Sequence, residues 1–181
     1  MNSGQTALVS IKTFSDQNLS AMKSVVRELK NTSIIKKISS VYKVSRPAES
    51  LVALRDIRKE EHLECYAAVA EIESQLAATE LLQRLKHIEK LHQKEYLRRS
   101  ISLNLLLYAE DVVMSPELSL PHPEMHLRPE EIVLATEIAG SLHHPVLKEN
   151  LARLAQKFAK ESWGEFFAQG KSLFESERES I

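Results

Sequence analysis

Glycine and cysteine are scarce in this chain, and both shortages narrow its possible functions. The 181 residues include only four glycines: Gly4, Gly140, Gly164 and Gly170. Walker and Rossmann phosphate loops need several glycines within a short stretch, so both are excluded. The single cysteine, Cys65, lies in an apolar run and cannot form an internal disulfide. A reducing compartment therefore fits, and we expect a cytoplasmic protein.

The chain also lacks long apolar runs and a surplus of either charge. Lysine and arginine number 24 against 25 aspartates and glutamates. This balance gives no electrostatic footprint for nucleic acid. No segment approaches the roughly 20 apolar residues that span a bilayer, and no signal peptide is evident at the start. We expect binding to neither nucleic acid nor membrane.

Strand and helix patterns alternate along the chain and then give way to helices alone. We predict strands at 7–11, 34–45, 64–74 and 101–107, helices at 15–30, 77–96 and 128–142, and a surface excursion at 46–62. The segment 112–125 is predicted to be hairpin and loop, and the chain from residue 145 onward to be helical. This order indicates one sheet covered by helices.

Apolar residues mark the face of each predicted element that is expected to enter the core. On the first helix they are Leu19, Met22, Val25, Val26 and Leu29. On the second helix, with Thr79 at or near its N-cap, they are Leu81, Leu82, Leu85, Ile88 and Leu91. On the last strand they are Ile101, Leu103, Leu105 and Leu107. On the C-terminal helix they are Val146, Leu147, Leu151, Leu154 and Phe158.

The third helix has clear start and stop signals. Pro129 occupies its first turn, and Glu130 and Glu131 suit the positive end of the helix dipole. Gly140 ends it. The chain beyond carries Trp163, Phe166, Phe167 and Phe174, more aromatic surface than one exposed helix should present. We expect this tail to fold back on the domain or to form a dimer interface.

One polar stretch stands out as a candidate site. Ser102 and Asn104 share the strand face opposite the apolar one, after Arg98 and Arg99 and before His122 and Arg128. Such a set resembles one wall of an anion site, because arginine binds phosphate with two hydrogen bonds. A solvated polar strand face is the simpler alternative. Prolines around His122 and His126 argue against a helical metal motif there, and no metal is expected.

The motifs SSVYKV, YAAVAEIES, RRSISLNLL, PHPEMHLR and TEIA occur in an order that resembles the 6-hydroxymethyl-7,8-dihydropterin pyrophosphokinase family. Members of this folate-pathway family transfer diphosphate from ATP to a pterin alcohol. The resemblance implies an α+β, ferredoxin-like, three-layer fold with an antiparallel-rich sheet. We expect that domain over residues 7–144 and a C-terminal helical extension over residues 145–181.

The resemblance also implies positions for the ligands, and several carry unexpected residues. The two magnesium-binding aspartates of the family correspond to Ser102 and Asn104. The two aromatics that stack on the pterin correspond to Glu64 and Glu130, and the asparagine between them corresponds to Tyr66. The family's glycine-serine-asparagine turn corresponds to Lys12, Thr13 and Phe14.

Other family positions carry the expected residues. Glu89, Arg99, His122 and Arg128 match the nucleotide-side residues, and Arg99 is the candidate catalytic residue. Magnesium and ATP are implied if the activity is retained. The loop before the last strand, which closes over ATP in the family, is shorter here.

Three functions compete at this point. The first is a catalytically dead or impaired homologue that acts as a binding or regulatory module, a pseudoenzyme, and it is the one that the substitutions favour. The second is an active ATP-dependent pyrophosphokinase of folate biosynthesis. The third is a structural protein that assembles through its C-terminal helices. Candidate partners are ATP or another phosphorylated small molecule, a protein, or a second copy of the chain.

Overall fold

A six-stranded sheet forms the centre of the computed structural model, which describes residues 4–14, 18–45, 64–93 and 100–174. The strand order is β5-β1-β4-β3-β8. β3 pairs with the first half of β4, and β2 pairs with the second half of the same strand. All these ladders are antiparallel. The strands are β1 Gln5–Thr13, β2 Ile34–Ile38, β3 Val41–Ser45, β4 Glu64–Ser74, β5 Ile101–Tyr108 and β8 Glu165–Ala168.

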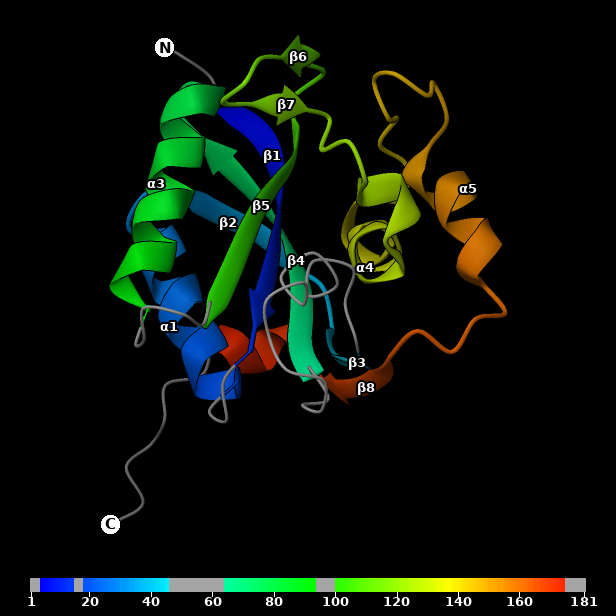
Figure 1. Ribbon diagram of the computed structural model, residues 1–181, viewed down its shortest axis with the longest axis horizontal. Helices are drawn as coiled ribbons and strands as arrows, with labels where there is room; N and C mark the ends of the chain where they lie inside the picture. The colour runs from blue at the N-terminus through cyan, green and yellow to red at the C-terminus, as the bar shows by residue number, and fades with distance from the viewer. Residues whose placement is uncertain (1–3, 15–17, 46–63, 94–99, 175–181) are drawn as a thin grey trace.

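Helices cover both faces of the sheet, which makes three layers (Figure 1). One face carries α1 (Asn18–Lys30) and α3 (Ala78–Leu91), and the other carries α4 (Pro129–Ala139) and α5 (Leu151–Ala155). Smaller elements complete the described chain: the hairpin β6 (Val113–Met114) and β7 (Ser119–Leu120), and the 3₁₀ turns η1 (Met125–Leu127), η2 (Gln156–Phe158) and η3 (Gly170–Phe174). The predicted α+β fold with an antiparallel sheet is confirmed. No helix in the described ranges has the length and apolar character needed to traverse a bilayer.

The layer under α1 and α3 is mainly apolar. Buried residues come from β1, α1, α3 and β5, and those on the two helices are Met22, Val25, Val26, Leu29, Leu81, Leu85 and Ile88. They confirm most of the predicted helix faces. Leu91 was predicted to point inward, but it is 59% exposed because α3 ends at this residue. The N-cap of α3 is Ala77 rather than Thr79. The N–H of Ala77 donates to the Glu80 side chain.

The layer under α4 corrects the predicted face of β5. Leu106 and Leu107 both pack with residues of α4, whereas Ile101, Leu103 and Leu105 pack on the α1 and α3 side. A bulge causes the switch, since Val9 pairs with Leu105 but Leu8 pairs with Leu107. Leu107 therefore lies on the opposite face from the one that strict alternation predicts.

Small residues on β4 allow a helix to approach the sheet closely on each side. Cys65, Ala67 and Val69 pack in the α4 layer, and Ala68 and Ala70 pack in the other. α4 packs directly against β4. The predicted single strand over 34–45 is instead two strands, separated at Ser39, whose hydroxyl accepts a hydrogen bond from the N–H of Val69.

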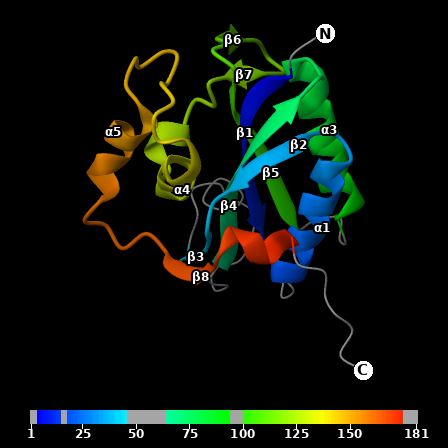
Figure 2. The same ribbon diagram turned by 180° about the vertical axis from the view of Figure 1, so that it is seen from behind.

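The C-terminal segment differs most from its predicted helical form. Val146 and Leu147 are exposed in a loop, and α5 begins only at Leu151, capped by the Asn150 side chain. The aromatic tail then forms β8 along β3, and η3 lies beside α1 (Figure 2). The tail therefore folds back on the domain, one of its two predicted outcomes. The division at residue 145 stays a prediction.

Aromatic contacts explain why this tail forms a strand rather than a helix. Trp163 stacks on Tyr42 with ring centroids 4.9 Å apart, and Phe167 meets Tyr66 edge to face at 4.5 Å. Phe166 also contacts Tyr42, at 5.9 Å. Pairs of this geometry stabilise by about 0.5 to 1.5 kcal/mol beyond their buried area. A strand presents its aromatic side chains to both tyrosines of the neighbouring strands.

Candidate functional site

Polar side chains gather on the sheet face that α4 covers, at the end of β1 and the start of β5. Leu8 of β1 packs in the α4 layer, so Ser10 and Lys12, two and four residues later, share its face. Lys12 pairs with Ser102 and Ser10 pairs with Asn104 across the ladder. Four polar residues on adjacent strands thus face one helix.

Lys12 is a fully buried cation at the centre of this group. Its side chain is 0% exposed, and its Nζ lies 3.1 Å from Glu130 Oε1 and 3.1 Å from Glu131 Oε1. Both glutamates belong to the first turn of α4, which Pro129 starts after an extended Arg128. Their side chains are 3% and 0% exposed. The strand and the helix are therefore joined by two buried ion pairs.

Glu131 collects several donors on one oxygen. Its Oε1 accepts from Lys12, from Asn104 Nδ2 at 3.4 Å and from Arg128 Nη1 at 3.5 Å. Its buried Oε2 has no hydrogen-bond partner within the described ranges. We call Lys12, Glu130, Glu131, Asn104 and Arg128 the Lys12 cluster. Opposite charges on neighbouring elements hold it together without water contact at its centre.

Arg128 and His122 are held by the segment between β7 and α4. Arg128 is 7% exposed, and its guanidinium contacts Glu131 and Glu124. The N–H of His122 donates to the carbonyl of Leu106 on β5 at 2.8 Å, which fixes the segment against the sheet. His122 Nδ1 accepts from the N–H of Glu124 at 3.3 Å. Both predicted residues thus border the face on which Ser102 and Asn104 lie.

Comparison of the sequence with known proteins identifies the family of this chain. The model of 7,8-dihydro-6-hydroxymethylpterin-pyrophosphokinase (HPPK) matches residues 9–140 of the chain. The chain belongs to the HPPK family. It is 31% identical over 147 residues to the 2-amino-4-hydroxy-6-hydroxymethyldihydropteridine pyrophosphokinase of Haemophilus influenzae, covering 79% of this chain and 84% of that protein.

Two further HPPK-family similarities are more distant. The pyrophosphokinase of the same name from Aquifex aeolicus is 30% identical over 87 residues, covering 46% of this chain and 54% of that protein. The crystal structure of wild-type HPPK-DHPS from Plasmodium falciparum superposes with a TM-score of 0.65 at 12% identity. That match covers 86% of this chain and 45% of the Plasmodium chain, and it concerns the fold alone.

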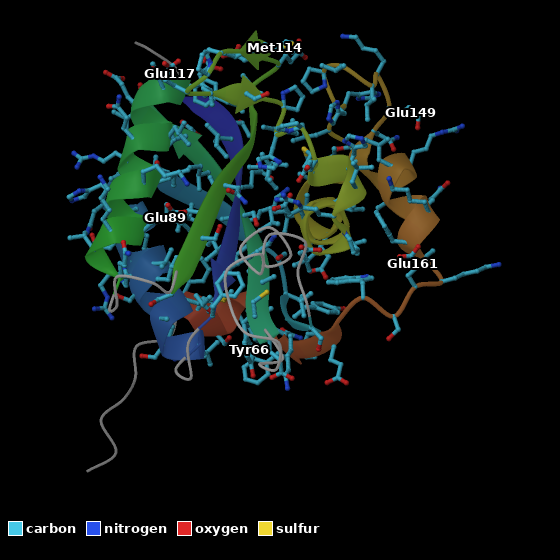
Figure 3. All side chains as sticks on the ribbon, viewed as in Figure 1. Tyr66, Glu89, Met114, Glu117, Glu149 and Glu161 are labelled. Atoms are coloured by element: carbon cyan, nitrogen blue, oxygen red, sulfur yellow. The ribbon has the colours of Figure 1, made fainter. Side chains whose placement is uncertain are left out.

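The three residues that the resemblance assigns to the pterin positions have separate partners in the structure. Glu64 is exposed and pairs with Lys43 at 3.0 Å on the next strand. Tyr66, labelled in Figure 3, packs on the α1 and α3 side of the sheet. Its ring meets Phe167 edge to face. Glu130 is buried on the opposite side with Lys12. Glu64 and Tyr66 therefore share one face of β4, whereas Glu130 lies on the other side of the sheet.

Glu89, which the resemblance assigns to the nucleotide side, contacts the edge strand β5. Its Oε1 accepts from the N–H of Leu103 at 2.7 Å, and its carboxylate pairs with Lys86 at 3.0 Å (Figure 3). The first contact satisfies a backbone donor on the outer edge of β5. Arg99, the candidate catalytic residue, lies outside the described residues, as do Arg98 and the excursion at 46–62.

Lys12 and Glu131 are the site residues that sequence reasoning missed. Lys12 was considered only as a replacement in a turn, and Glu131 only as a partner of the helix dipole. A signal was present, because Ser10 and Lys12 interrupt one face of an otherwise apolar strand. The same interruption occurs at Ser102 and Asn104. Two adjacent strands with matching polar interruptions indicate a shared buried polar group.

A second polar group lies beyond α4. His144 is 4% exposed, and its Nδ1 accepts from the N–H groups of Val146 and Leu147 at 3.3 and 3.1 Å. Its ring meets His126 at 5.9 Å. Burial lowers the pKa of His144, and His126 adds to this; burial lowers the pKa of His126, and Lys157 adds to this. The Nδ1 contacts place the proton of neutral His144 on Nε2, which disfavours a metal there.

A half-open cavity of about 310 Å³ lies at the other end of β1 and β5. Its walls include Thr6, Leu8, Leu107, Glu110 and His143. Lys12 and Ser102 lie at the far end of the same two strands. The cavity is therefore separate from the face that the HPPK resemblance implicates.

Proposed function

We propose that this HPPK-family chain does not transfer diphosphate and instead acts as a binding or regulatory module. The observation that carries the proposal is the Lys12 cluster, which includes Asn104 and lies beside Ser102. Family membership alone would favour the enzyme. The cluster changes the charge of the face on which the reaction would take place.

Magnesium does not fit the donor set on this face. Magnesium prefers carboxylate oxygens and gives up its water reluctantly, whereas Ser102 and Asn104 offer a hydroxyl and an amide. Asn104 also turns its Nδ2 toward Glu131. The nearby carboxylates already surround the ammonium group of Lys12, whose charge opposes a divalent cation. The residues on this face of the sheet are therefore poor magnesium ligands, and we expect the module to bind its ligand without a metal.

The pterin positions give independent support. Flat rings stack on aromatic faces, but Glu64 and Glu130 supply carboxylates. Desolvating an unpaired polar group against a ring costs roughly 1 to 3 kcal/mol. Tyr66, the remaining aromatic, is engaged with Phe167. A pterin would have to displace these contacts.

Two of the nucleotide positions, Arg128 and Glu89, are retained in type but engaged within the fold. Arg128 contacts two glutamates, and Glu89 caps the edge of β5. An arginine that is already paired with a carboxylate binds phosphate with a smaller gain in free energy, because the existing ion pair must first be broken. The proposal therefore expects weak ATP binding. The ligand of the module is another phosphorylated molecule or a protein partner.

The decisive assay measures AMP released from ATP in the presence of hydroxymethyl-dihydropterin and magnesium. The wild-type chain is expected to release no more AMP than an Arg99→Ala, His122→Ala control. Calorimetry of ATP, with and without magnesium, should show no magnesium dependence. AMP release clearly above that control would establish the active pyrophosphokinase instead.

A restored variant separates the metal positions from the pterin pocket. Ser102→Asp with Asn104→Asp returns two carboxylates to the same strand face, so magnesium-dependent ATP binding should tighten. Turnover should not return, because Glu64 and Glu130 remain. If this double variant alone regained transfer, the pterin pocket would be intact and the proposal of a repurposed module would be wrong.

A further inference from the structure

The centre of the Lys12 cluster has the chemistry of a cation site. Two carboxylate oxygens, Glu130 Oε1 and Glu131 Oε1, lie at equal distances of 3.1 Å from one positively charged nitrogen. The second oxygen of Glu131 is buried without a hydrogen-bond partner within the described ranges. The Ser10 hydroxyl, two residues from Lys12 on the same strand face, is likewise buried and without a partner there.

Charge and size define which cation this site accepts. Glu130 and Glu131 carry two negative charges, and Arg128 compensates part of that charge from one side at 3.5 Å. A separation of about 3 Å between nitrogen and oxygen is that of a charge-assisted ammonium contact and is longer than the 2.0 to 2.1 Å at which magnesium binds oxygen. The site therefore suits a monovalent cation of ammonium size.

We propose that Glu130, Glu131 and their neighbours form a monovalent-cation site whose resident occupant is the ammonium group of Lys12. The cation is supplied by the chain itself and cannot exchange with solution. It joins β1 to the first turn of α4 permanently. The inference concerns this cluster alone, and it holds whether or not the chain transfers diphosphate.

Shortening the lysine tests whether a free cation can take its place. In Lys12→Ala the carboxylates keep their positions while the tethered ammonium is absent. Ammonium chloride should then raise the thermal midpoint of the variant in a saturable way, with one ion bound per chain. Tetramethylammonium chloride, at equal ionic strength, should not, because that ion is too large. The wild-type midpoint should respond equally to both salts.

Two control variants separate this effect from a general loss of charge. Lys36→Ala removes a lysine that pairs with Glu73 at 2.7 Å on the surface, and its midpoint should not distinguish the two salts. Lys12→Ala with Glu131→Gln removes one wall of the site, and the preference for ammonium should disappear. An equal response of Lys12→Ala to both salts, or an unchanged preference in the double variant, would refute the proposal.

A further variant covers the case in which Lys12→Ala does not fold alone. Lys12→Met fills the same space without charge and leaves no room for an ion. It should show no preference between the salts, and it should be less stable than the wild type, because the two buried glutamates then lack the cation that pairs with them. If Lys12→Met matched the wild type in stability, Lys12 would not act as the resident cation. For Lys12→Ala itself, the refolding yield in each salt provides the same comparison.

Discussion

The two faces of the central sheet follow different rules. Under α1 and α3 the buried layer consists mainly of apolar side chains, to which both helices contribute leucines at helical spacing. Under α4 the apolar layer shares the interface with a fully buried lysine and two buried glutamates. Hydrophobic burial is non-directional, whereas buried charges require matched partners at defined distances.

This difference determines which face of the sheet tolerates amino-acid substitutions. The apolar face can be repacked by any residues of similar volume. The α4 face cannot lose one charge without leaving another uncompensated. Variants on each face should therefore differ in size of effect and in dependence on their neighbours.

The largest expected effect is that of Glu131→Ala. It removes the carboxylate that Lys12, Asn104 and Arg128 all contact, and breaking a buried pair costs about 3 to 5 kcal/mol. Urea unfolding followed by circular dichroism measures the loss. The matched control is Glu149→Ala, whose exposed pair with Arg153 should change stability by no more than about 0.5 kcal/mol. A loss as small as that of the control would place the cluster among the dispensable contacts.

The apolar face is tested by Leu85→Ala on α3. Leu85 is fully buried, so the cavity left behind should cost about 3 kcal/mol in the same unfolding assay. Leu91→Ala serves as the control on the same helix, because Leu91 is exposed and should change little. Combined with Glu131→Ala, the two losses should add within about 0.5 kcal/mol, since the sheet separates the sites. Strong coupling would mean that the two faces are not independent.

A smaller effect is expected at the edge of the sheet. Phe167→Ala removes the edge-to-face contact with Tyr66 from a half-exposed position and should cost about 1 kcal/mol. Phe167→Leu keeps apolar area without the ring and should lose less. Thermal unfolding of both variants compares them. An identical loss in the two would assign the effect to the ring contact with Tyr66 and would mean that the apolar area kept by leucine contributes nothing.

The smallest change concerns pH and the loop after α4. Burial lowers the pKa of His144 in the folded chain, so the unfolded chain binds its proton first as the pH falls. The stability that His144 contributes is therefore complete above the ordinary pKa of about 6.5 and is lost as the pH falls toward the folded value. Protonation at Nδ1 would also remove the acceptor of two backbone N–H groups.

Thermal midpoints of the wild type and of His144→Asn, recorded between pH 7.5 and pH 5, measure how much stability His144 loses on acidification. The asparagine can still accept a hydrogen bond but does not titrate, so the variant should lose less stability on acidification. Parallel curves for the two proteins would exclude His144 as the source.

Periodicity predicted one face of the sheet far better than the other. The buried stripe of α1 and most of that of α3 followed from apolar spacing, because burial of those residues needs no specific partner. The side on which Leu107 lies could not be predicted, because a bulge between two strands leaves no mark in either strand's sequence. The strand form of the aromatic tail depended on Tyr42 and Tyr66, which lie far away in the chain.

The candidate site was predicted from resemblance at its positions but not in its contacts. Ser102 and Asn104 were placed on one polar face, and the ladder puts Lys12 and Ser10 opposite them. The pairing of Lys12 with Glu130 and Glu131 spans most of the chain and depends on how α4 crosses the sheet. No local pattern contains that crossing, so the ion pairs were beyond sequence reasoning.

The position of β1 has a consequence for how the chain folds. β1, which precedes its two partners in the chain, lies inside the sheet between β4 and β5, and both partners come from much later in the sequence. Contacts between residues distant in sequence close long loops before they gain any stabilisation, which slows folding. Until β5 is available, β1 keeps one edge unpaired, and Lys12 near its end has no helix to meet. A newly made chain therefore carries an incomplete sheet that exposes an apolar strand, and this is the stage at which aggregation competes with folding.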